Sequence, residues 1–226
     1  MMSEERARLI RVWHDHAYEM QRASLPARMR FMGLDLDIAE DVFAPHSDDG
    51  EGDPYHLAVQ AEVKEGERVL DMGTGSGVSA ILAARAGAEV VAVDVNPKAV
   101  GCARQNAERN GVADRITFFA ADIFDGVTGT FDLIVFDPPF RWFKPRDLLE
   151  MGTADENYQG LTRFMNQAPD RLRRGGRVLL NFGTSGDIDY LYSLIAKVGL
   201  RKEVTPYGEA TRDGMTAHYF WIRLTA

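Results

Sequence analysis

The chain has 226 residues, enough for one domain with a sizeable core, and 45% of them are hydrophobic against 27% charged. Its 34 acidic and 26 basic side chains give a formal net charge of −8, which argues against broad, sequence-independent binding of nucleic acid. One cysteine, Cys102, excludes an internal disulfide and a multi-thiolate metal site. We also expect no metal, no signal peptide and no membrane-spanning segment, and hence a cytoplasmic location.

The first 54 residues are predicted to form an N-terminal extension to a domain of residues 55–226. Residues 3–23 have the pattern of an amphipathic helix, whose apolar stripe would include Trp13 and His16. Residues 35–53 contain eight acidic side chains and no basic one, which indicates an irregular, solvated linker or lid. Asp53 followed by Pro54 is typical of a helix start.

From residue 67 onward, apolar strands alternate with helices, which predicts a parallel sheet covered by helices on both faces. The last two strands are separated by about nine residues, too few for a parallel crossover, so they should form an antiparallel hairpin at one edge. The predicted strands are 68–72, 89–95, 115–122, 131–137, 176–182, 201–207 and 217–224, and the predicted helices are 77–86, 96–111, 157–173 and 187–198.

Carboxylates end four consecutive predicted strands. Asp71 precedes a glycine-rich turn that runs to Gly77, and Asp94, Asp122 and Asp137 end the next three strands. Ligands of parallel sheets bind at the carboxyl ends of the strands, and glycines let the backbone approach a ligand closely. A series of four such carboxylates predicts a ligand site better than four unrelated helix caps.

A dinucleotide site also uses a glycine-rich turn and a later acidic residue. Here the glycines are Gly73, Gly75 and Gly77, and position 78 is Val, so the third glycine of the G-x-G-x-x-G pattern is absent. The combination with the tetrapeptide Asp137-Pro-Pro-Phe140 decides between the two kinds of site.

Four segments together resemble the successive motifs of class I S-adenosylmethionine-dependent methyltransferases. They are VLDMGTGSG (69–77), VVAVDVN (90–96), AADIFD (120–125) and FDLIVFDPPF (131–140), and the resemblance covers residues 55–224. It implies an α/β, Rossmann-like fold with a seven-stranded sheet of order 3-2-1-4-5-7-6, strand 7 antiparallel, and S-adenosyl-L-methionine as cofactor.

The resemblance also implies roles for individual residues. Asp71 and the glycine turn would hold the methionine part of the cofactor, Asp94 its ribose hydroxyls, and Asp122 with Ile123 its adenine. The implied cofactor-binding set is Asp71, Gly73, Thr74, Gly75, Gly77, Asp94, Val95, Asp122, Ile123 and Asp137.

Asp137-Pro-Pro-Phe140 matches the Asx/Ser-Pro-Pro-aromatic tetrapeptide of amino-methyltransferases, which include base-amino and release-factor glutamine enzymes. A side-chain oxygen at 137 and the Pro138 carbonyl can accept N–H bonds and orient a nitrogen lone pair, and Phe140 can stack on a planar acceptor. The candidate catalytic residues are therefore Asp137, Pro138 and Phe140. A carboxylate at 137 suits a base amino group or a cationic amine.

Further residues are expected at the mouth of the acceptor site. The candidate substrate-binding residues are Pro139, Arg141 and Trp142 around the tetrapeptide, and Phe43, His46 and Tyr55 from the acidic segment. The arginines of residues 171–177 are expected to be a solvated helix end on the opposite face.

Three functions are compatible with this pattern. The leading one is methylation of a nitrogen in an RNA base or a translation protein, because the segment after the tetrapeptide is loosely similar to release-factor glutamine and ribosomal-RNA guanine methyltransferases. The second is N- or O-methylation of a small metabolite. The third is a non-catalytic, cofactor-binding partner subunit; a nicotinamide dehydrogenase lacks its second catalytic domain here.

Overall fold

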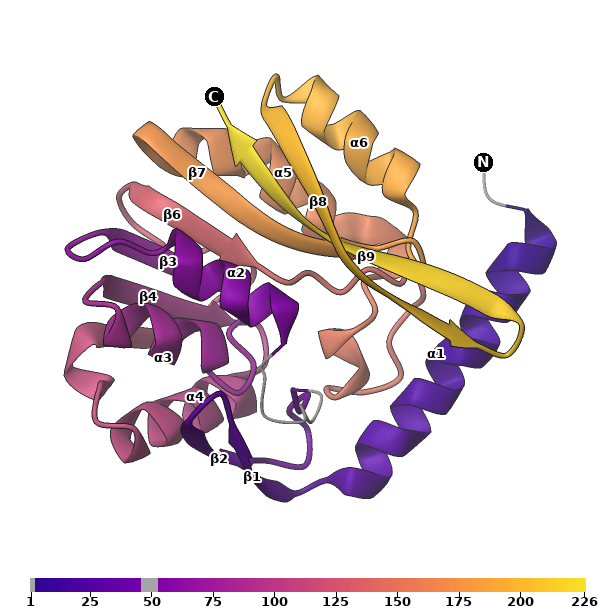
Figure 1. Cartoon of the computed structure of the whole chain (residues 1–226), viewed down its shortest axis with the longest axis horizontal. Helices are drawn as coiled ribbons and strands as arrows, with labels where there is room; N and C mark the ends of the chain where they lie inside the picture. The colour runs from indigo at the N-terminus through magenta and orange to yellow at the C-terminus, as the bar shows by residue number, and fades with distance from the viewer. Residues whose placement is uncertain (1–2, 46–52) are drawn as a thin grey trace.

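The computed structural model describes residues 3–45 and 53–226, which fold around one large mixed β-sheet (Figure 1). Its seven strands lie in the order β5-β4-β3-β6-β7-β9-β8. β9 runs antiparallel to β7 and β8, whereas the other neighbouring pairs are parallel. The bounds are β3 (Arg68–Met72), β4 (Glu89–Asp94), β5 (Ile116–Ala120), β6 (Phe131–Phe136), β7 (Leu172–Gly183), β8 (Arg201–Arg212) and β9 (Met215–Thr225). Numbered within the sheet, this is the predicted order 3-2-1-4-5-7-6, so the fold class is confirmed.

Helices cover both faces of this sheet because successive strand residues point to opposite sides. Val69 and Val90 belong to the core under α2, α3 and α4, whereas Leu70 and Ile134 belong to the core under α5 and α6. The helices are α1 (Glu4–Ser24), α2 (Pro54–Glu62), α3 (Val78–Arg85), α4 (Pro97–Arg109), α5 (Gln159–Gln167) and α6 (Ile188–Lys197). Short 3₁₀ turns are η1 (Ala113–Arg115), η2 (Glu150–Gly152), η3 (Glu156–Tyr158) and η4 (Ala168–Arg171).

The predicted start of α2 is confirmed in its local chemistry. The Asp53 carboxylate accepts the Tyr55 backbone N–H at 2.7 Å, and Pro54 occupies the first turn. α4 begins in the same way, with Asn96 accepting the Lys98 N–H at 2.9 Å. A side-chain cap of this kind satisfies one of the backbone donors that a helix start leaves free.

The prediction of an irregular segment from residue 35 is wrong at its beginning. β1 (Ala27–Phe31) and β2 (Leu34–Ile38) form an antiparallel hairpin, and Leu36 and Ile38 are buried in the main core. The sequence LDLDI alternates with the period of a strand, but its acidic residues hide that pattern from a count of charges.

The buried face of α1 includes Trp13, as expected, but not His16. His14 is buried at 3% exposure, whereas the His16 side chain is 61% exposed. The buried face also contains Ile10 and Trp13, which pack against Met215 near the tip of the β8–β9 hairpin. That hairpin is longer than predicted, because both strands continue to a turn at Asp213-Gly214 with positive φ at both residues.

The expectation of a solvated helix end holds for only some of the arginines of residues 171–177, because Arg173 and Arg174 are exposed whereas Arg177 is not. They lie at η4 and the start of β7, and the Arg177 side chain is only 11% exposed. Arg177 is held by Glu62 and Glu67, as described below. Among residues 3–45 and 53–226, no helix is long and apolar enough to cross a membrane. The same residues contain no cluster of acidic, His and Cys side chains arranged to hold a metal ion.

Candidate active site

The glycine-rich turn after β3 is pinned to the neighbouring strand. The backbone N–H groups of Gly73 and Thr74 both donate to the Val93 carbonyl of β4, at 2.8 and 2.9 Å. Gly77 has φ +90°, and a Cβ there would lie 3.0 Å from Ala103 of α4. Only glycine therefore lets α3 start this close to α4. At Gly75, by contrast, a Cβ would meet nothing nearer than 4.0 Å, so this part of the turn is open.

Asp71 at the end of β3 holds the turn from inside. It is 4% exposed, and its Oδ2 accepts the Thr74 hydroxyl at 2.6 Å and the Ala80 backbone N–H at 3.1 Å. Burial raises the pKa of Asp71 to about 6, against the lowering effect of these hydrogen bonds. Asp71 therefore orders the loop and the first turn of α3.

Asp94 at the end of β4 meets the same turn. One carboxylate oxygen accepts the Gly75 N–H at 2.9 Å and the other accepts the Asn96 N–H at 2.8 Å. Burial raises the pKa of Asp94, and these backbone hydrogen bonds oppose it. Each oxygen still has a lone pair for another donor. The adjacent Val95 is 45% exposed, so an apolar surface lies beside this carboxylate.

Asp122 lies at the rim after β5, as predicted, but it already has a partner. Its half-exposed carboxylate forms an ion pair with Arg163 of α5. Ile123 has φ +57° and packs at the edge of the core under α5. A positive φ is uncommon for a branched side chain, so the chain turns sharply here.

Asp137 follows β6 and is the end of a chain of hydrogen bonds. Its Oδ1 accepts the Asn181 side-chain N–H of β7 at 2.9 Å, and the Asn181 carbonyl oxygen accepts the Tyr207 hydroxyl of β8 at 2.9 Å. Asp137 is exposed to solvent, yet the protein around it desolvates the carboxyl and raises its pKa to about 6. With a pKa of about 6, Asp137 is mainly a carboxylate at pH 7.

The rest of the tetrapeptide is held by the turn after β7. Pro138 is buried, Pro139 and Phe140 are half-buried, and the Phe140 carbonyl accepts the Tyr158 hydroxyl at 3.1 Å. A Cβ at Gly186 would lie 2.4 Å from that same carbonyl oxygen, so glycine is required for this packing. The Phe140 ring lies between Phe182 and Tyr219, at centroid distances of 5.4 and 6.4 Å.

The structure brings most of the predicted acceptor residues toward this loop. Arg141 is buried beside Phe140, Trp142 packs on Phe143, and a Cβ at Gly152 would lie 3.2 Å from Phe43. Tyr55 is 2% exposed, its hydroxyl has no hydrogen-bond partner among the described residues, and burial raises its pKa, with further contributions from the charges of Asp137 and Asp71. His46 lies outside the described residues.

Asn181 and Tyr207 are site residues that the sequence analysis missed. An asparagine at the end of the apolar run GRVLLNF was a signal, since an amide in a buried strand needs a partner. Tyr207 had no such signal, because it reaches Asn181 only through the pairing of β8 and β7 with β9.

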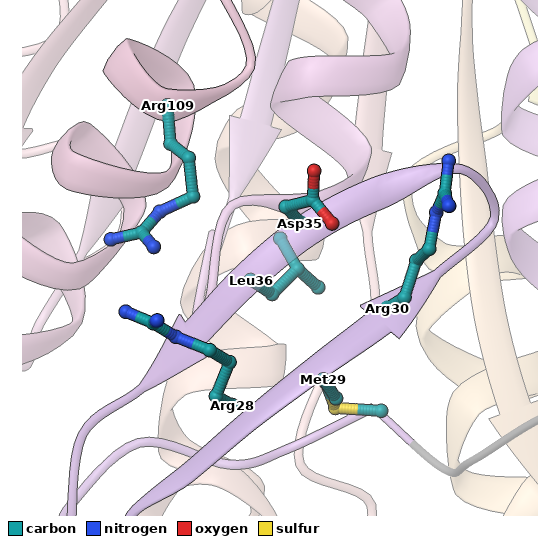
Figure 2. A pocket seen from close by; sticks show the side chains of 6 residues that line it. All are labelled: Arg28, Met29, Arg30, Asp35, Leu36 and Arg109. Atoms are coloured by element: carbon teal, nitrogen blue, oxygen red, sulfur yellow. The ribbon is translucent and has the colours of Figure 1, made fainter.

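A surface hollow of about 410 Å³ lies elsewhere, between the β1–β2 hairpin and α4 (Figure 2). Arg28, Arg30 and Arg109 are among the residues that line it. Two of these arginines, Arg28 and Arg109, are already neutralised by Asp37. The tetrapeptide Asp137–Phe140 does not line this hollow, so it is separate from the carboxylates described above.

Comparison with known proteins identifies the fold and the chemistry. Residues 55–183 match the family model described as the methyltransferase small domain. The chain is 31% identical over 181 residues to a putative protein N5-glutamine methyltransferase of Methanocaldococcus jannaschii, covering 76% of this chain and 88% of that one. It is 39% identical over 138 residues to the release factor glutamine methyltransferase of Chlorobaculum tepidum, covering 52% of this chain and 46% of that one.

A solved structure agrees with the fold. The 16S rRNA N2 G1207 methyltransferase of T. thermophilus, in complex with AdoMet and guanosine, superposes with a TM-score of 0.64 at 24% identity, covering 88% of this chain and 49% of that one. The chain belongs to the methyltransferase small domain family of class I S-adenosylmethionine-dependent methyltransferases.

Proposed function

We propose that this methyltransferase transfers the methyl group to a nitrogen atom of an RNA base or of a translation protein. The observation that carries the proposal is the anchored carboxylate of Asp137 at the end of β6. The relatives support it, because their names describe glutamine methylation of proteins and methylation of a guanine amino group in rRNA.

The residues of the rim suit the cofactor. The open backbone at Gly75, next to the pinned Gly73 and Thr74, would take the methionine part, with Asp71 and Gly77 shaping the turn. Asp94 has lone pairs left for the ribose hydroxyls. The exposed Val95 and the half-buried Ile123 would flank the adenine, together with Asp122 after it leaves its ion pair with Arg163.

Asp137 and the Pro138 carbonyl would orient the acceptor. Asn181 fixes Oδ1, and Oδ2 has no partner among the described residues, so Oδ2 can accept one N–H while the Pro138 carbonyl accepts another. When bound, S-adenosylmethionine supplies an electrophilic methyl whose bond to sulfur breaks as nitrogen bonds the carbon, the electron pair staying on sulfur. The proton of the resulting cationic nitrogen passes to Asp137 or to water. Phe140 would pack on a planar acceptor.

We further propose that α1, within the N-terminal extension of residues 1–54, covers the acceptor side. Ile10 and Trp13 pack on Phe143, three residues after the tetrapeptide. The buried His14 imidazole hydrogen-bonds Glu150 at 2.6 Å, which ties α1 to the segment that follows the tetrapeptide. Removal of α1 should therefore impair acceptor use more than cofactor binding.

Methyl-labelled S-adenosylmethionine, incubated with the protein and host-cell RNA, protein and small-molecule fractions, tests the proposal. Label should enter RNA or protein, and Asp137→Ala should lower the rate by about 10²–10³, the usual effect of losing one pre-organised polar group. Asp125→Asn, an exposed aspartate in the same region, is the matched control. Because the pKa of Asp137 is raised to about 6, the rate should rise with pH through about 6.

Label found only in small molecules would move the assignment to metabolite methylation. Cofactor binding without label in any fraction would contradict an N-methyltransferase and favour a partner subunit. Asp137→Asn separates the two uses of this side chain, because the amide keeps an acceptor oxygen but takes no proton. An unchanged rate in that variant would show that water removes the proton.

A further inference from the structure

Arg141 is a buried guanidinium without an acidic partner. It is 7% exposed, its Nε has no hydrogen-bond partner, and no carboxylate in residues 3–45 or 53–226 forms an ion pair with it. Buried charges in folded proteins are ordinarily paired. Arg177, the comparable arginine at the other end of the sheet, is bound by both Glu62 and Glu67.

Aromatic packing explains only part of the burial of Arg141. The guanidinium carbon lies 4.5 Å from the centroid of the Phe140 ring, a cation–π contact that contributes at most about 2 kcal/mol. Removing an ion from water costs several kcal/mol, so this contact leaves a deficit. Burial lowers the pKa of Arg141 to about 10, so the guanidinium is still charged at pH 7.

The backbone holds Arg141 rigidly next to the acceptor loop. Its N–H donates to the Thr153 carbonyl at 3.2 Å, and its carbonyl accepts the Asp155 N–H at 2.7 Å. The Tyr158 hydroxyl donates to the carbonyl of Phe140. The backbone of Arg141 is thus fixed four residues beyond Asp137.

A second buried donor lies on the turn that packs against the same aromatic ring. Ser185 is 0% exposed, and its hydroxyl has no partner among the described residues. The next residue, Gly186, lies against the Phe140 backbone. A guanidinium has five donors and no acceptor, and a serine hydroxyl can also donate. The Nε of Arg141 can be satisfied only by an acceptor, and a negatively charged oxygen suits its charge; the Ser185 hydroxyl can donate to a group of the same kind.

We infer that Arg141, with Ser185 as a second donor, binds a negatively charged oxygen group of the methyl acceptor, either a carboxylate or a phosphate. The guanidinium fork matches both groups through two parallel hydrogen bonds. The inference rests on the proposed transfer to an acceptor nitrogen held by Asp137. It adds that this acceptor carries an anion close to the methylated nitrogen, which an uncharged glutamine side chain does not.

Nitrogen-15 NMR of the full chain, saturated with S-adenosylhomocysteine, tests the inference without an acceptor in hand. The Nε–Hε resonance of Arg141, assigned through its contacts to the Phe140 ring, is followed during titration with inorganic phosphate or with acetate. Chloride at matched ionic strength is the reference. For at least one of the two probes we expect a saturable shift of this resonance, with a dissociation constant on the order of 1–10 mM. A response to phosphate alone indicates a phosphate-bearing acceptor, and a response to acetate alone a carboxylate.

Variants sharpen the result. Arg141→Lys keeps the charge but loses the fork, and removing a charged hydrogen bond should weaken probe binding about tenfold or more, which resonances of Phe140 report. Ser185→Ala should weaken it by a smaller factor, and Arg173→Gln, at the opposite rim, should not change it. The titration of the unmodified chain stands even where a variant does not fold.

The two proposals fail in different ways. Methyl transfer to nitrogen without any saturable shift beyond chloride would overturn the anion site and leave the proposed function intact. A saturable shift in a chain that labels no fraction would overturn the proposed function and leave Arg141 as an anion site of a binding protein.

Discussion

The two ends of the central sheet differ in whether their buried charged side chains have partners of opposite charge. At the amino end, Arg177 of β7 donates to Glu62 at 2.8 Å and to Glu67 at 2.9 Å, and Arg223 of β9 adds a second cation to Glu62. Burial alone would raise the pKa of Glu62, but the hydrogen bonds from Arg223 and Arg177 bring it below the usual range. Each buried charge there has its partner inside the protein.

At the carboxyl end, Asp122 pairs with Arg163, but other charged groups have no partner of opposite charge among the described residues. Desolvation by the surrounding protein raises the pKa values of the buried Asp71 and the exposed Asp137 to about 6. Arg141 has no acidic partner among the described residues, and the buried Tyr55 hydroxyl has no hydrogen-bond partner among them. The protein thus pairs its buried charges internally at one rim and leaves some of them without an internal partner at the other, where we propose that the ligands bind.

We expect the largest effect on stability from removing the ion pairs of Arg177 at the amino end of the sheet. Arg177→Met keeps the volume but leaves the carboxylates of Glu62 and Glu67 without their main cation. Removing one partner of a buried ion pair typically costs about 3–5 kcal/mol, so the free energy of unfolding should fall by that amount in urea titrations. Cofactor binding by the folded protein should not change. A loss below about 1 kcal/mol would contradict the assignment of stability to this rim.

A smaller effect should come from Asp71, as a dependence of stability on pH. Its pKa is about 6 in the folded chain against about 3.9 unfolded, so the folded state binds the proton more tightly. The stability that it contributes is present below pH 4 and is lost as pH rises through about 6, a change of about 2–3 kcal/mol.

Asp71→Asn removes this titration and keeps one acceptor oxygen for Thr74 or Ala80. Unfolding free energies of both proteins, measured from pH 4 to pH 7, should therefore converge or cross as the wild type loses its advantage. Taking the difference cancels the acids with lowered pKa values, such as Glu62, which act in the opposite direction. Parallel curves would show that Asp71 is not desolvated in solution.

Arg141→Met is the counterpart of Arg177→Met at the carboxyl end of the sheet. It removes a charge that has no acidic partner among the described residues and only a cation–π contact with Phe140, and methionine fills a similar volume against that ring. The free energy of unfolding should change by less than about 1 kcal/mol, or rise, because an apolar side chain avoids the desolvation penalty. A loss as large as that of Arg177→Met would mean that Arg141 has a structural partner.

The sequence predicted the features that are local or strictly periodic. The glycine turn, the carboxylates at the strand ends and the antiparallel hairpin at the edge follow from such patterns. The full strand order was implied by the family resemblance, and the structure confirms it. Partners brought together by strand pairing could not be predicted in this way. Asn181 and Asp137 are 44 positions apart, and Tyr207 meets Asn181 across β9.

The sequence also could not show which arginines have acidic partners in the folded protein. Arg141 and Arg177 are both followed by apolar residues and both lie near strands, yet one is unmatched and the other is held by two carboxylates. The β1–β2 hairpin was missed for a different reason, because a count of acidic residues masked the alternation of Leu34, Leu36 and Ile38.

The smallest expected effect tests whether burial, and not the number of charges, makes the amino end stabilising. Arg173 pairs with Asp132 at 2.6 Å at that same rim, but the two side chains are 45% and 27% exposed. An exposed pair gains little in water and is screened by salt, so its coupling energy should be about 0.5 kcal/mol or less and should fade in 1 M salt. Asp132 also accepts the Arg68 backbone N–H at 2.8 Å, so Asp132→Asn alone would overstate the pair. A double-mutant cycle of Arg173→Gln and Asp132→Asn isolates it. A coupling near that of the buried Arg177 network would mean that proximity of charge is sufficient, and the contrast between the two rims would then lie in composition and not in desolvation.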